Sequence, residues 1–258
     1  MHIKKHHSRL LTSSQIDRAD RILDARIKSR TPLAYLLNEA WLGRHRFFVD
    51  QRVIIPRSFI AEFIETGLAQ WLPARRKKLR ALDLCTGSGC LAIVLAKTFR
   101  GMHVDAVDVS GPALEVAHVN IKRHHLQSRT RAILSDLLTG IPESVRYDLI
   151  VSNPPYVRTS SMRALPMEYR HEPTLALAGG TDGLELVSRI LDSARQYLTP
   201  KGVLVLEVGH NKKAMEKTFP RLPILWLDTL SSEGMLALIE AKDIPERSKP
   251  RGQKRGKT

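Results

Sequence analysis

The chain has 258 residues, of which 43% are apolar, and it carries 41 Lys and Arg against 26 Asp and Glu, a net charge of +15. This length and composition predict one full core with a small appendage, and they exclude a disordered chain and a pair of large domains. The two cysteines, Cys85 and Cys90, exclude a disulfide scaffold and a four-cysteine zinc site, and no metal site is expected. No apolar run reaches the roughly 20 residues of a membrane helix, and the first residues lack an apolar signal core, so we predict a cytoplasmic protein without a membrane partner.

The positive charge gathers in three stretches, at residues 4–9, at 73–80 and in the tail at 245–258. The tail has six Lys and Arg, one Glu and no large apolar residue, which predicts a disordered segment. A net charge of this size indicates a polyanionic partner, with nucleic acid as the first candidate. Each stretch alone is typical of a solvated end or turn. The three together make RNA contact an equal alternative to simple solvation, and the sequence leaves both open.

Residues 1–75 predict a small helical and β-hairpin module. Ser13 or Ser14 can cap a first helix, in which apolar residues recur at helical spacing. The stretch at 40–55 mixes β-branched and aromatic residues around Gly43, which indicates a hairpin or ribbon. Ser58 can cap a second helix, whose apolar face is formed by Ile60, Phe63, Ile64 and Leu68.

Apolar runs alternate with helical patterns from residue 76 to residue 244, which predicts an α/β domain whose sheet is covered by helices on both faces. Seven strands are expected, at 81–84, 103–107, 132–134, 147–152, 203–208, 225–228 and 235–239. Helices are expected at 90–98, 112–124, 183–197 and 212–219. The last two strands are too close in sequence for a crossover helix between them, so they should run antiparallel and make the sheet mixed.

The first chemical motif is a glycine turn, Asp83-Leu84-Cys85-Thr86-Gly87-Ser88-Gly89, which follows a strand and opens a helix. Gly87 and Gly89 let the backbone approach a ligand where a Cβ atom would collide. Asp108 ends the next strand, where a carboxylate can accept both hydroxyl hydrogens of a ribose. The turn lacks the full G-x-G-x-x-G spacing of dinucleotide sites, and the chain has no phosphate-binding Gly-x-x-x-x-Gly-Lys-Ser/Thr sequence. S-adenosylmethionine is therefore the cofactor that fits the pattern best.

Asp136 follows the third strand of this domain. Its carboxylate could meet the adenine amino group of that cofactor, or it could cap a loop. The sequence leaves the two roles equally open.

The second motif, Asn153-Pro154-Pro155-Tyr156, ends the fourth strand, at the edge of the sheet where open α/β sheets bind ligands. The Asn153 side chain and the Pro154 carbonyl can together accept both hydrogens of a planar NH₂ group, and Tyr156 can form a flat wall beside it. The prolines stiffen the backbone and remove two N–H donors. These features indicate methylation of an amide or exocyclic amine by positioning and electrostatics, with no general base required before transfer.

The two motifs in this order resemble class I S-adenosylmethionine-dependent methyltransferases with a Rossmann-like fold. The sequences Arg30-Thr31-Pro32-Leu33-Ala34-Tyr35-Leu36 and Val53-Ile54-Ile55-Pro56-Arg57 extend the resemblance to the protein-(glutamine-N5) methyltransferases. Within that family, Cys85, Ser58 and the segments 169–173 and 180–184 are similar to the branch that acts on a ribosomal protein. The resemblance runs from about residue 11 to residue 240, although relatives carry more helical sequence ahead of it.

The resemblance implies transfer of a methyl group from S-adenosylmethionine to the N5 atom of a glutamine in a large-subunit ribosomal protein, the third one. It implies a cofactor pocket formed by Asp83, Cys85, Thr86, Gly87, Ser88, Gly89, Asp108, Asp136, Leu137 and Asn153, and a glutamine site at Asn153, Pro154, Pro155 and Tyr156. Arg57 and Glu62 would help to join the front module to the site or would form a structural ion pair. Apart from the resemblance, the charge of the basic ends predicts contact with ribosomal RNA if the substrate protein is met beside it.

Three alternatives stay open at this point. A nucleic-acid amine methyltransferase of the adenine-N6 type uses the same Asn-Pro-Pro-aromatic chemistry, and the positive charge favours it. A release-factor glutamine methyltransferase shares the family's motifs. A non-enzymatic RNA-binding assembly factor would fit the charge, but Asp108 and the intact second motif speak against it.

Overall fold

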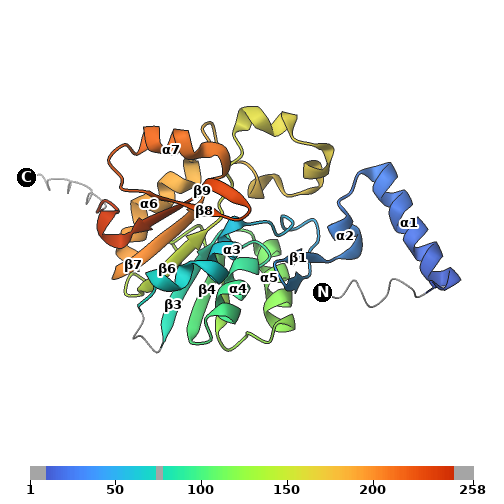
Figure 1. The fold of residues 1–258 in the computed structure, drawn as a ribbon, viewed down its shortest axis with the longest axis horizontal. Helices are drawn as coiled ribbons and strands as arrows, with labels where there is room; N and C mark the ends of the chain where they lie inside the picture. Colours follow the sequence, from blue (N-terminus) through green and yellow to red (C-terminus); the bar gives the residue numbers. More distant parts are fainter. Residues whose placement is uncertain (1–9, 74–77, 247–258) are drawn as a thin grey trace, which may run out of the picture.

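The computed structural model describes residues 10–73 and 78–246, and a seven-stranded sheet forms the centre of this part of the chain. The strand order is β5-β4-β3-β6-β7-β9-β8 (Figure 1). The strands are β3 (Leu79–Leu84), β4 (Met102–Asp108), β5 (Thr130–Leu134), β6 (Tyr147–Ser152), β7 (Leu198–Glu207), β8 (Leu225–Thr229) and β9 (Ser232–Glu240).

The sheet is mixed, as the sequence predicts. Strands β5, β4, β3, β6 and β7 are parallel, whereas β9 pairs antiparallel with both β7 and β8. Strand β7 begins five residues earlier than predicted, because Leu198 already pairs with Tyr147 ahead of an irregularity in the register. Strands β5 and β9 also begin a few residues before their predicted starts, at Thr130 and Ser232.

Helices cover both faces of the sheet. Apolar residues of α3 (Phe59–Thr66), α4 (Cys90–Thr98) and α5 (Gly111–Arg123) form one core cluster with one face of the strands. Residues of α6 (Glu185–Tyr197) and α7 (Lys212–Thr218) form a second cluster on the other face. Strands buried on both faces explain the nearly continuous apolar runs of the sequence, such as Tyr147–Ser152, in which every residue is buried.

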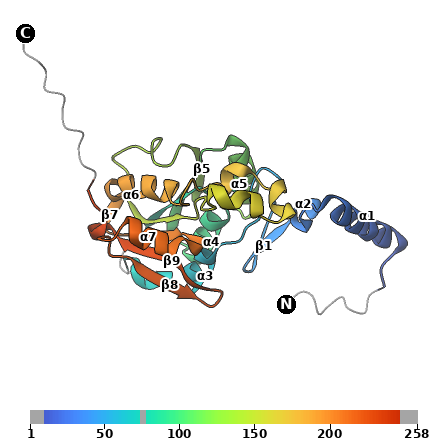
Figure 2. The ribbon, with the colours of Figure 1, turned by 90° about the horizontal axis from the view of Figure 1, so that it is seen from above.

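The front module consists of α1 (Ser13–Ser29), α2 (Leu33–Leu37) and the short hairpin of β1 (Ala40–Leu42) and β2 (His45–Phe47). Helix α1 has no buried residue and projects from one end of the molecule (Figures 1 and 2). The prediction of its cap was wrong: Thr12 is the N-cap, and its hydroxyl and the Gln15 side chain form a reciprocal capping box.

The predicted ribbon at 40–55 is regular only up to Phe47, and the chain continues to Ser58 as a loop. Ser58 caps α3 as predicted, since its hydroxyl accepts a hydrogen bond from the Ile60 N–H group. Between β6 and α6 the chain forms the 3₁₀ turns η3 (Thr159–Ala164), η4 (Met167–His171) and η5 (Thr174–Ala176), which the sequence patterns did not reveal. The predicted basic ends at 4–9 and 247–258 lie outside the described residues.

Strand order reverses between β3 and β6, because β3 continues to β4 on one side while β6 continues to β7 on the other. In open α/β sheets a crevice forms at the carboxyl ends of the strands at such a point. Both motifs predicted from the sequence end strands that flank it: Asp83 lies in β3 and Asn153 follows β6. No described helix is long and apolar enough to cross a membrane.

Candidate active site

A cavity of about 280 Å³ lies at the carboxyl ends of the strands, on the side of β3, β4 and β5. Of the residues predicted to bind the cofactor, six line it: Cys85, Gly87, Asp108, Asp136, Leu137 and Asn153. Its other walls come from the front loop, from the turn before α5 and from the segment around α6, and include Arg52, Val53, Ile54, Ser110, Leu175, Ala176, Leu186 and Arg189.

Gly87 exposes its backbone to this cavity. Its φ angle is +54°, and a Cβ atom there would meet nothing within 4 Å. Gly89, at φ +78°, has a different role: a Cβ atom there would lie 3.2 Å from the Cβ atom of Ala117, so this glycine permits close packing of α4 on α5. The open space beside Gly87 fits the predicted approach of a ligand to the backbone, and the same prediction for Gly89 stays a prediction.

The Asp108 carboxylate is fixed at the end of β4 by backbone donors. Gly87 N–H donates to Oδ2 at 2.8 Å and Ser110 N–H donates to Oδ1 at 2.9 Å. Burial raises the pKa of Asp108, and these N–H groups oppose that shift. Because each carboxylate oxygen can accept two hydrogen bonds, each oxygen keeps one acceptor position for a ligand hydroxyl.

The Asp83 carboxylate turns away from the cavity and into the protein. It is fully buried, and its Oδ2 accepts hydrogen bonds from the Thr86 hydroxyl at 2.5 Å and from the Ala92 N–H at 3.0 Å. Burial raises the pKa of Asp83 to about 7. Thr86 and Ser88 are also buried, and neither they nor Gly89 line the cavity. These four residues shape the glycine turn beside the cavity, and their predicted contact with the cofactor stays a prediction.

Two non-glycine residues of the cavity adopt left-handed backbone conformations, Cys85 at φ +58° and Leu137 at φ +50°. Such conformations are unfavourable for residues with a side chain and are frequent at functional sites. Asp136, next to Leu137, forms an ion pair with Arg189 at 2.7 Å, with half of its side chain exposed. The carboxylate thus joins the loop after β5 to α6 at the cavity rim, and the sequence carried no signal for this partner.

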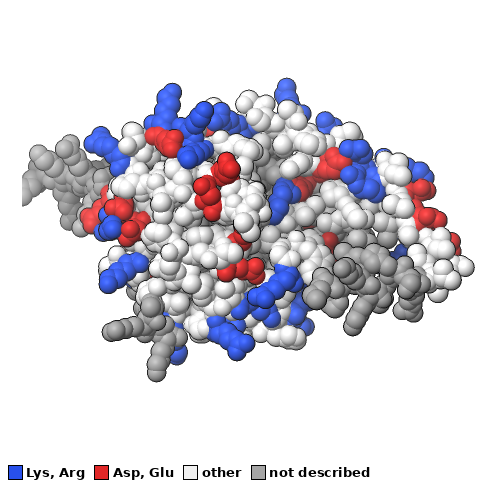
Figure 3. Space-filling view, viewed as in Figure 1, with Lys and Arg blue, Asp and Glu red and all other residues white. Residues whose placement is uncertain are grey.

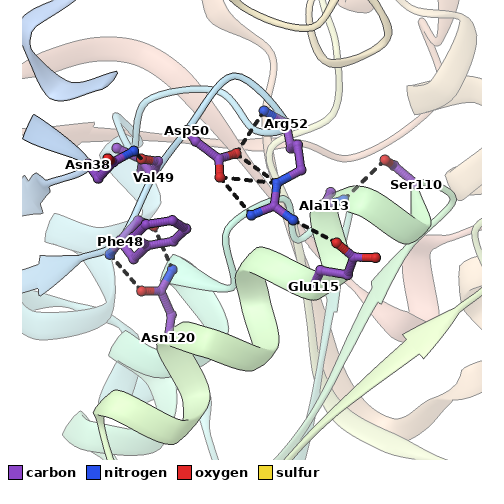
Figure 4. Close-up of polar contacts among 9 residues, drawn as sticks. All are labelled: Asn38, Phe48, Val49, Asp50, Arg52, Ser110, Ala113, Glu115 and Asn120. Atoms are coloured by element: carbon purple, nitrogen blue, oxygen red, sulfur yellow. Dashed lines mark hydrogen bonds and ion pairs between the residues drawn. The ribbon is translucent and has the colours of Figure 1, made fainter. Parts of the chain in front are cut away.

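The front wall of the cavity depends on a loop that lies across α5 (Figure 4). The Asn120 side chain accepts from the Phe48 N–H at 2.7 Å and donates to the Phe48 carbonyl at 2.9 Å. Arg52 binds Asp50 within the loop and Glu115 on α5, each at 2.6 Å. These contacts hold residues 52–54 against the cavity, although they lie some 30 residues before the glycine turn in sequence.

The second motif separates this cavity from a second one of about 390 Å³. Asn153 and Pro155 line both cavities, and Pro154 and Tyr156 line the second. No described residue forms a hydrogen bond with the Asn153 side-chain amide, so its oxygen and nitrogen are available at the junction. The four predicted catalytic residues therefore lie together, between a pocket that suits a nucleoside and a second pocket.

Several contacts hold Tyr156 in place. The Asn211 amide donates to the Tyr156 carbonyl at 2.8 Å, and a Cβ atom at Gly209 would lie 2.7 Å from the Tyr156 ring. The hydroxyl group lies 3.5 Å from Oε1 of Glu207, and burial raises the pKa of Tyr156. The ring is thus packed against the backbone of Gly209 and directed toward a buried carboxylate.

Glu207 is a site residue that the motifs did not indicate. It ends β7, is 1% exposed, and accepts hydrogen bonds from the Ser58 hydroxyl at 2.6 Å and from the Phe59 N–H at 3.0 Å. Burial raises the pKa of Glu207 to about 7. The carboxylate connects the start of α3 with Tyr156, and its only sequence signal was its place at a strand end.

Of the two roles left open for Arg57 and Glu62, an ion pair between them does not form. Arg57 forms a two-bond ion pair with Glu172, at 2.6 and 2.5 Å, and its guanidinium carbon lies 4.9 Å from the centre of the Tyr169 ring. Glu62 instead accepts a hydrogen bond from the Leu230 N–H. The Arg57–Glu172 pair joins the front module to the segment between β6 and α6, above the second cavity that Arg57 and Tyr169 line.

The family model described as methyltransferase small domain matches residues 65–167. The chain is 52% identical to the ribosomal protein uL3 glutamine methyltransferase of Bordetella pertussis, over 86% of this chain and 74% of that protein. It is 44% identical to the protein of the same name from Burkholderia pseudomallei, over 91% of this chain and 78% of that protein. The chain belongs to the family of ribosomal protein uL3 glutamine methyltransferases.

Among solved structures, the catalytic domain of human Mettl16 in complex with a MAT2A 3′UTR hairpin matches with a TM-score of 0.57 and 15% identity, over 91% of this chain and 84% of that chain. At this identity the likeness concerns the fold. Membership of the glutamine methyltransferase family makes the chain a methyltransferase, with S-adenosylmethionine as its methyl donor. The open backbone at Gly87 and the two free acceptor positions of Asp108 fit the nucleoside part of that donor.

Proposed function

We propose that the protein transfers a methyl group from S-adenosylmethionine to the side-chain amide nitrogen (N5) of a glutamine in ribosomal protein uL3, the third protein of the large subunit. The observation that carries the proposal is the Asn153 amide, which has no hydrogen-bond partner among the described residues and lies between the two cavities. The names of relatives at 44–52% identity support the choice of substrate.

The cofactor would lie in the 280 Å³ cavity, where it supplies a methyl group on a positively charged sulfur. Asp108 would accept hydrogen bonds from the ribose hydroxyls, and Gly87 would let the backbone approach the ligand. The half-exposed Asp136 lies close enough to the same cavity to meet the adenine amino group while it is paired with Arg189. Each of these cofactor contacts is part of the proposal.

The glutamine amide would enter from the second cavity. The Asn153 side-chain oxygen and the Pro154 carbonyl would accept its two N–H hydrogens, which holds the nitrogen and favours a more tetrahedral geometry at it. The nitrogen lone pair, which is delocalised in a free amide, is then directed toward the donor pocket. Tyr156 would pack against the flat amide. Catalysis of this kind relies on positioning and on fixed dipoles, and the nitrogen loses its proton after transfer.

The nucleic-acid amine alternative and the release-factor alternative receive less support. Both would use the same four residues, but the relatives at 44–52% identity are named for uL3. The intact motifs and the available Asn153 amide speak against a non-catalytic assembly factor. Contact between the basic ends and ribosomal RNA stays a proposal, because those residues lie outside the described part, and the cytoplasmic location and the domain limits at 75 and 244 also stay predictions.

The experiment that tests the proposal replaces Asn153 by alanine. With uL3 and methyl-labelled S-adenosylmethionine, we expect Asn153→Ala to lower kcat by about 10²-fold or more, because one of two groups that position the amide is lost. Calorimetry should find the affinity for S-adenosylhomocysteine within a few-fold of the wild-type value, which also shows that the variant is folded. Full activity of Asn153→Ala on uL3 would contradict the proposed role.

A further inference from the structure

The opposite edge of the sheet carries a hollow of about 760 Å³ that the proposed reaction does not use. It lies where β3, β4 and β5 begin, and we call it the amino-end groove. Its only acidic residue among the described residues is Asp105, against four cationic ones. The groove is lined by Lys78, Arg80, His103, Val104, Asp105, His118, Ile121, Gln127, Ser128, Arg129, Thr130, Arg131 and Ala132.

The buried Asp105 fixes two of these cations. Its carboxylate accepts hydrogen bonds from Arg131 at 3.1 Å, from Arg80 at 3.4 Å and from the Tyr147 hydroxyl at 2.7 Å. The Arg80 guanidinium also lies over the Tyr147 ring, 5.5 Å from its centre. One negative charge therefore holds two guanidinium groups in place, and an excess of positive charge remains.

Further hydrogen-bond donors surround these two cations. Arg129 binds the carbonyls of Ala96 and Met102 at 2.8 and 3.3 Å, so its charge is also held at the groove. The side chains of Lys78, His103, Gln127 and Ser128 are exposed along it. The buried Thr130 hydroxyl has no hydrogen-bond partner among the described residues. The groove thus presents fixed cations and neutral donors, a combination that suits phosphate groups.

The groove is far from the methyl-transfer site. Its residues lie at the first positions of strands that end at Leu84, Asp108 and Leu134, beside the candidate site. The strands are five to seven residues long, so the two edges lie roughly 15–20 Å apart at about 3.3 Å per residue. Figure 3 shows Lys and Arg side chains at several places on this face, both over α7 at the upper left and along the lower edge.

We propose that the amino-end groove binds the phosphate backbone of RNA and so holds the enzyme on an RNA-containing ribosomal particle that carries its substrate. This inference rests on the proposed function, which provides a substrate found beside RNA. At this distance the bound RNA serves as an anchor and is not itself methylated. The excess of positive charge and the guanidinium groups held in place favour the phosphate backbone of RNA over a protein partner.

The test uses the full chain with Lys78→Gln and Arg131→Gln combined, both at exposed positions. The matched control is Lys213→Gln with Lys217→Gln, which removes the same charge from the exposed face of α7. Binding of a labelled single-stranded fragment of large-subunit ribosomal RNA is measured over a range of salt concentrations. We expect the groove variant to bind roughly tenfold more weakly near 0.1 M salt, and the slope of log K against log salt to become smaller by about 1.4. The control should change little.

Methylation separates this inference from the proposed function. The groove variant should methylate free uL3 at the wild-type rate and unmethylated large-subunit particles more slowly. Wild-type affinity and slope in the groove variant, or equal losses in the control, would overturn the RNA site. The RNA site would also be overturned if the groove variant kept its affinity for RNA but lost binding of a polyglutamate peptide. That result would indicate an acidic protein partner. Failure of the wild-type protein to methylate uL3, both free and in unmethylated large-subunit particles, would instead contradict the proposed function.

Discussion

Three aspartates near three strand ends have three different environments in this enzyme. Asp83 points into the protein, Asp108 into the cofactor cavity, and Asp136 pairs with Arg189 at the cavity rim. The motifs indicate Asp108 as a cofactor residue and leave the role of Asp136 open, and the family resemblance implies all three. The sequence could not predict the direction of each side chain, since the partners Ala92 and Arg189 are defined only by tertiary packing.

Replacement of Asp108 should affect cofactor binding more than replacement of Asp136. In Asp108→Asn, an NH₂ group would face the N–H of Gly87 or Ser110, and one ligand acceptor would be lost, so we expect S-adenosylmethionine to bind about 10- to 100-fold more weakly. Asp136→Asn, the matched control at an exposed position, should lose less than tenfold. Calorimetric titration measures both, and equal losses would argue against a specific role of Asp108.

Asp83 should make the stability of the protein depend on pH. Its pKa is about 7 in the folded protein and 3.8 when unperturbed. Ionisation of this buried carboxyl group therefore destabilises the folded protein. This destabilisation is absent below about pH 4 and complete above pH 7. Relative to Asp83→Asn, the free energy of unfolding of the wild type should therefore fall by roughly 4 kcal/mol as the pH rises from 4 to 8. Urea unfolding of both proteins at several pH values measures this difference. The titration of Glu207 should change the free energy of unfolding by the same amount in both proteins, so it cancels in the difference. A constant difference would contradict the burial of Asp83.

At the scale of elements, the front module and the segment between β6 and α6 complete the site. The sequence predicted the strands and helices of the sheet domain, because their apolar periodicity reflects burial. It did not predict that residues 52–54 line the cofactor cavity or that η4 and η5 lie over the second cavity. Those placements depend on long-range contacts such as Asn120 with Phe48 and Arg57 with Glu172, which leave no periodic pattern.

Loss of the Arg57–Glu172 pair should impair the substrate side of the site and spare the cofactor side. In Glu172→Ala, the guanidinium loses both of its charged hydrogen bonds, so the front module should be held less firmly over the second cavity. We expect KM for uL3 to rise about tenfold, with S-adenosylmethionine affinity unchanged.

The matched control for this change is Glu240→Ala, which removes an exposed ion pair with Lys242 far from both cavities. Steady-state kinetics and calorimetry of the two variants should separate them clearly. If Glu172→Ala lowered the affinity for the cofactor without changing KM, the pair would support the cofactor pocket, and the prediction would be contradicted.

At the scale of the whole molecule, the two edges of the sheet have different chemistry. The carboxyl edge brings together the glycine turn, Asp108 and the Asn153–Tyr156 motif, all of which the sequence places at strand ends. The amino edge carries the cationic groove, whose residues 78–80, 103 and 129–131 are far apart in sequence. Composition indicated a polyanionic partner, but only the fold shows that these described cations lie on the side away from the methyl-transfer site.

The most direct measurement incubates the protein with methyl-labelled S-adenosylmethionine and unmethylated large-subunit material, separates protein from RNA, and locates the label by fragment mass spectrometry. We expect one added methyl group on uL3, at the side-chain amide nitrogen of a glutamine, and none on RNA. Label on an RNA base amine, or on another protein in place of uL3, would contradict the proposed function.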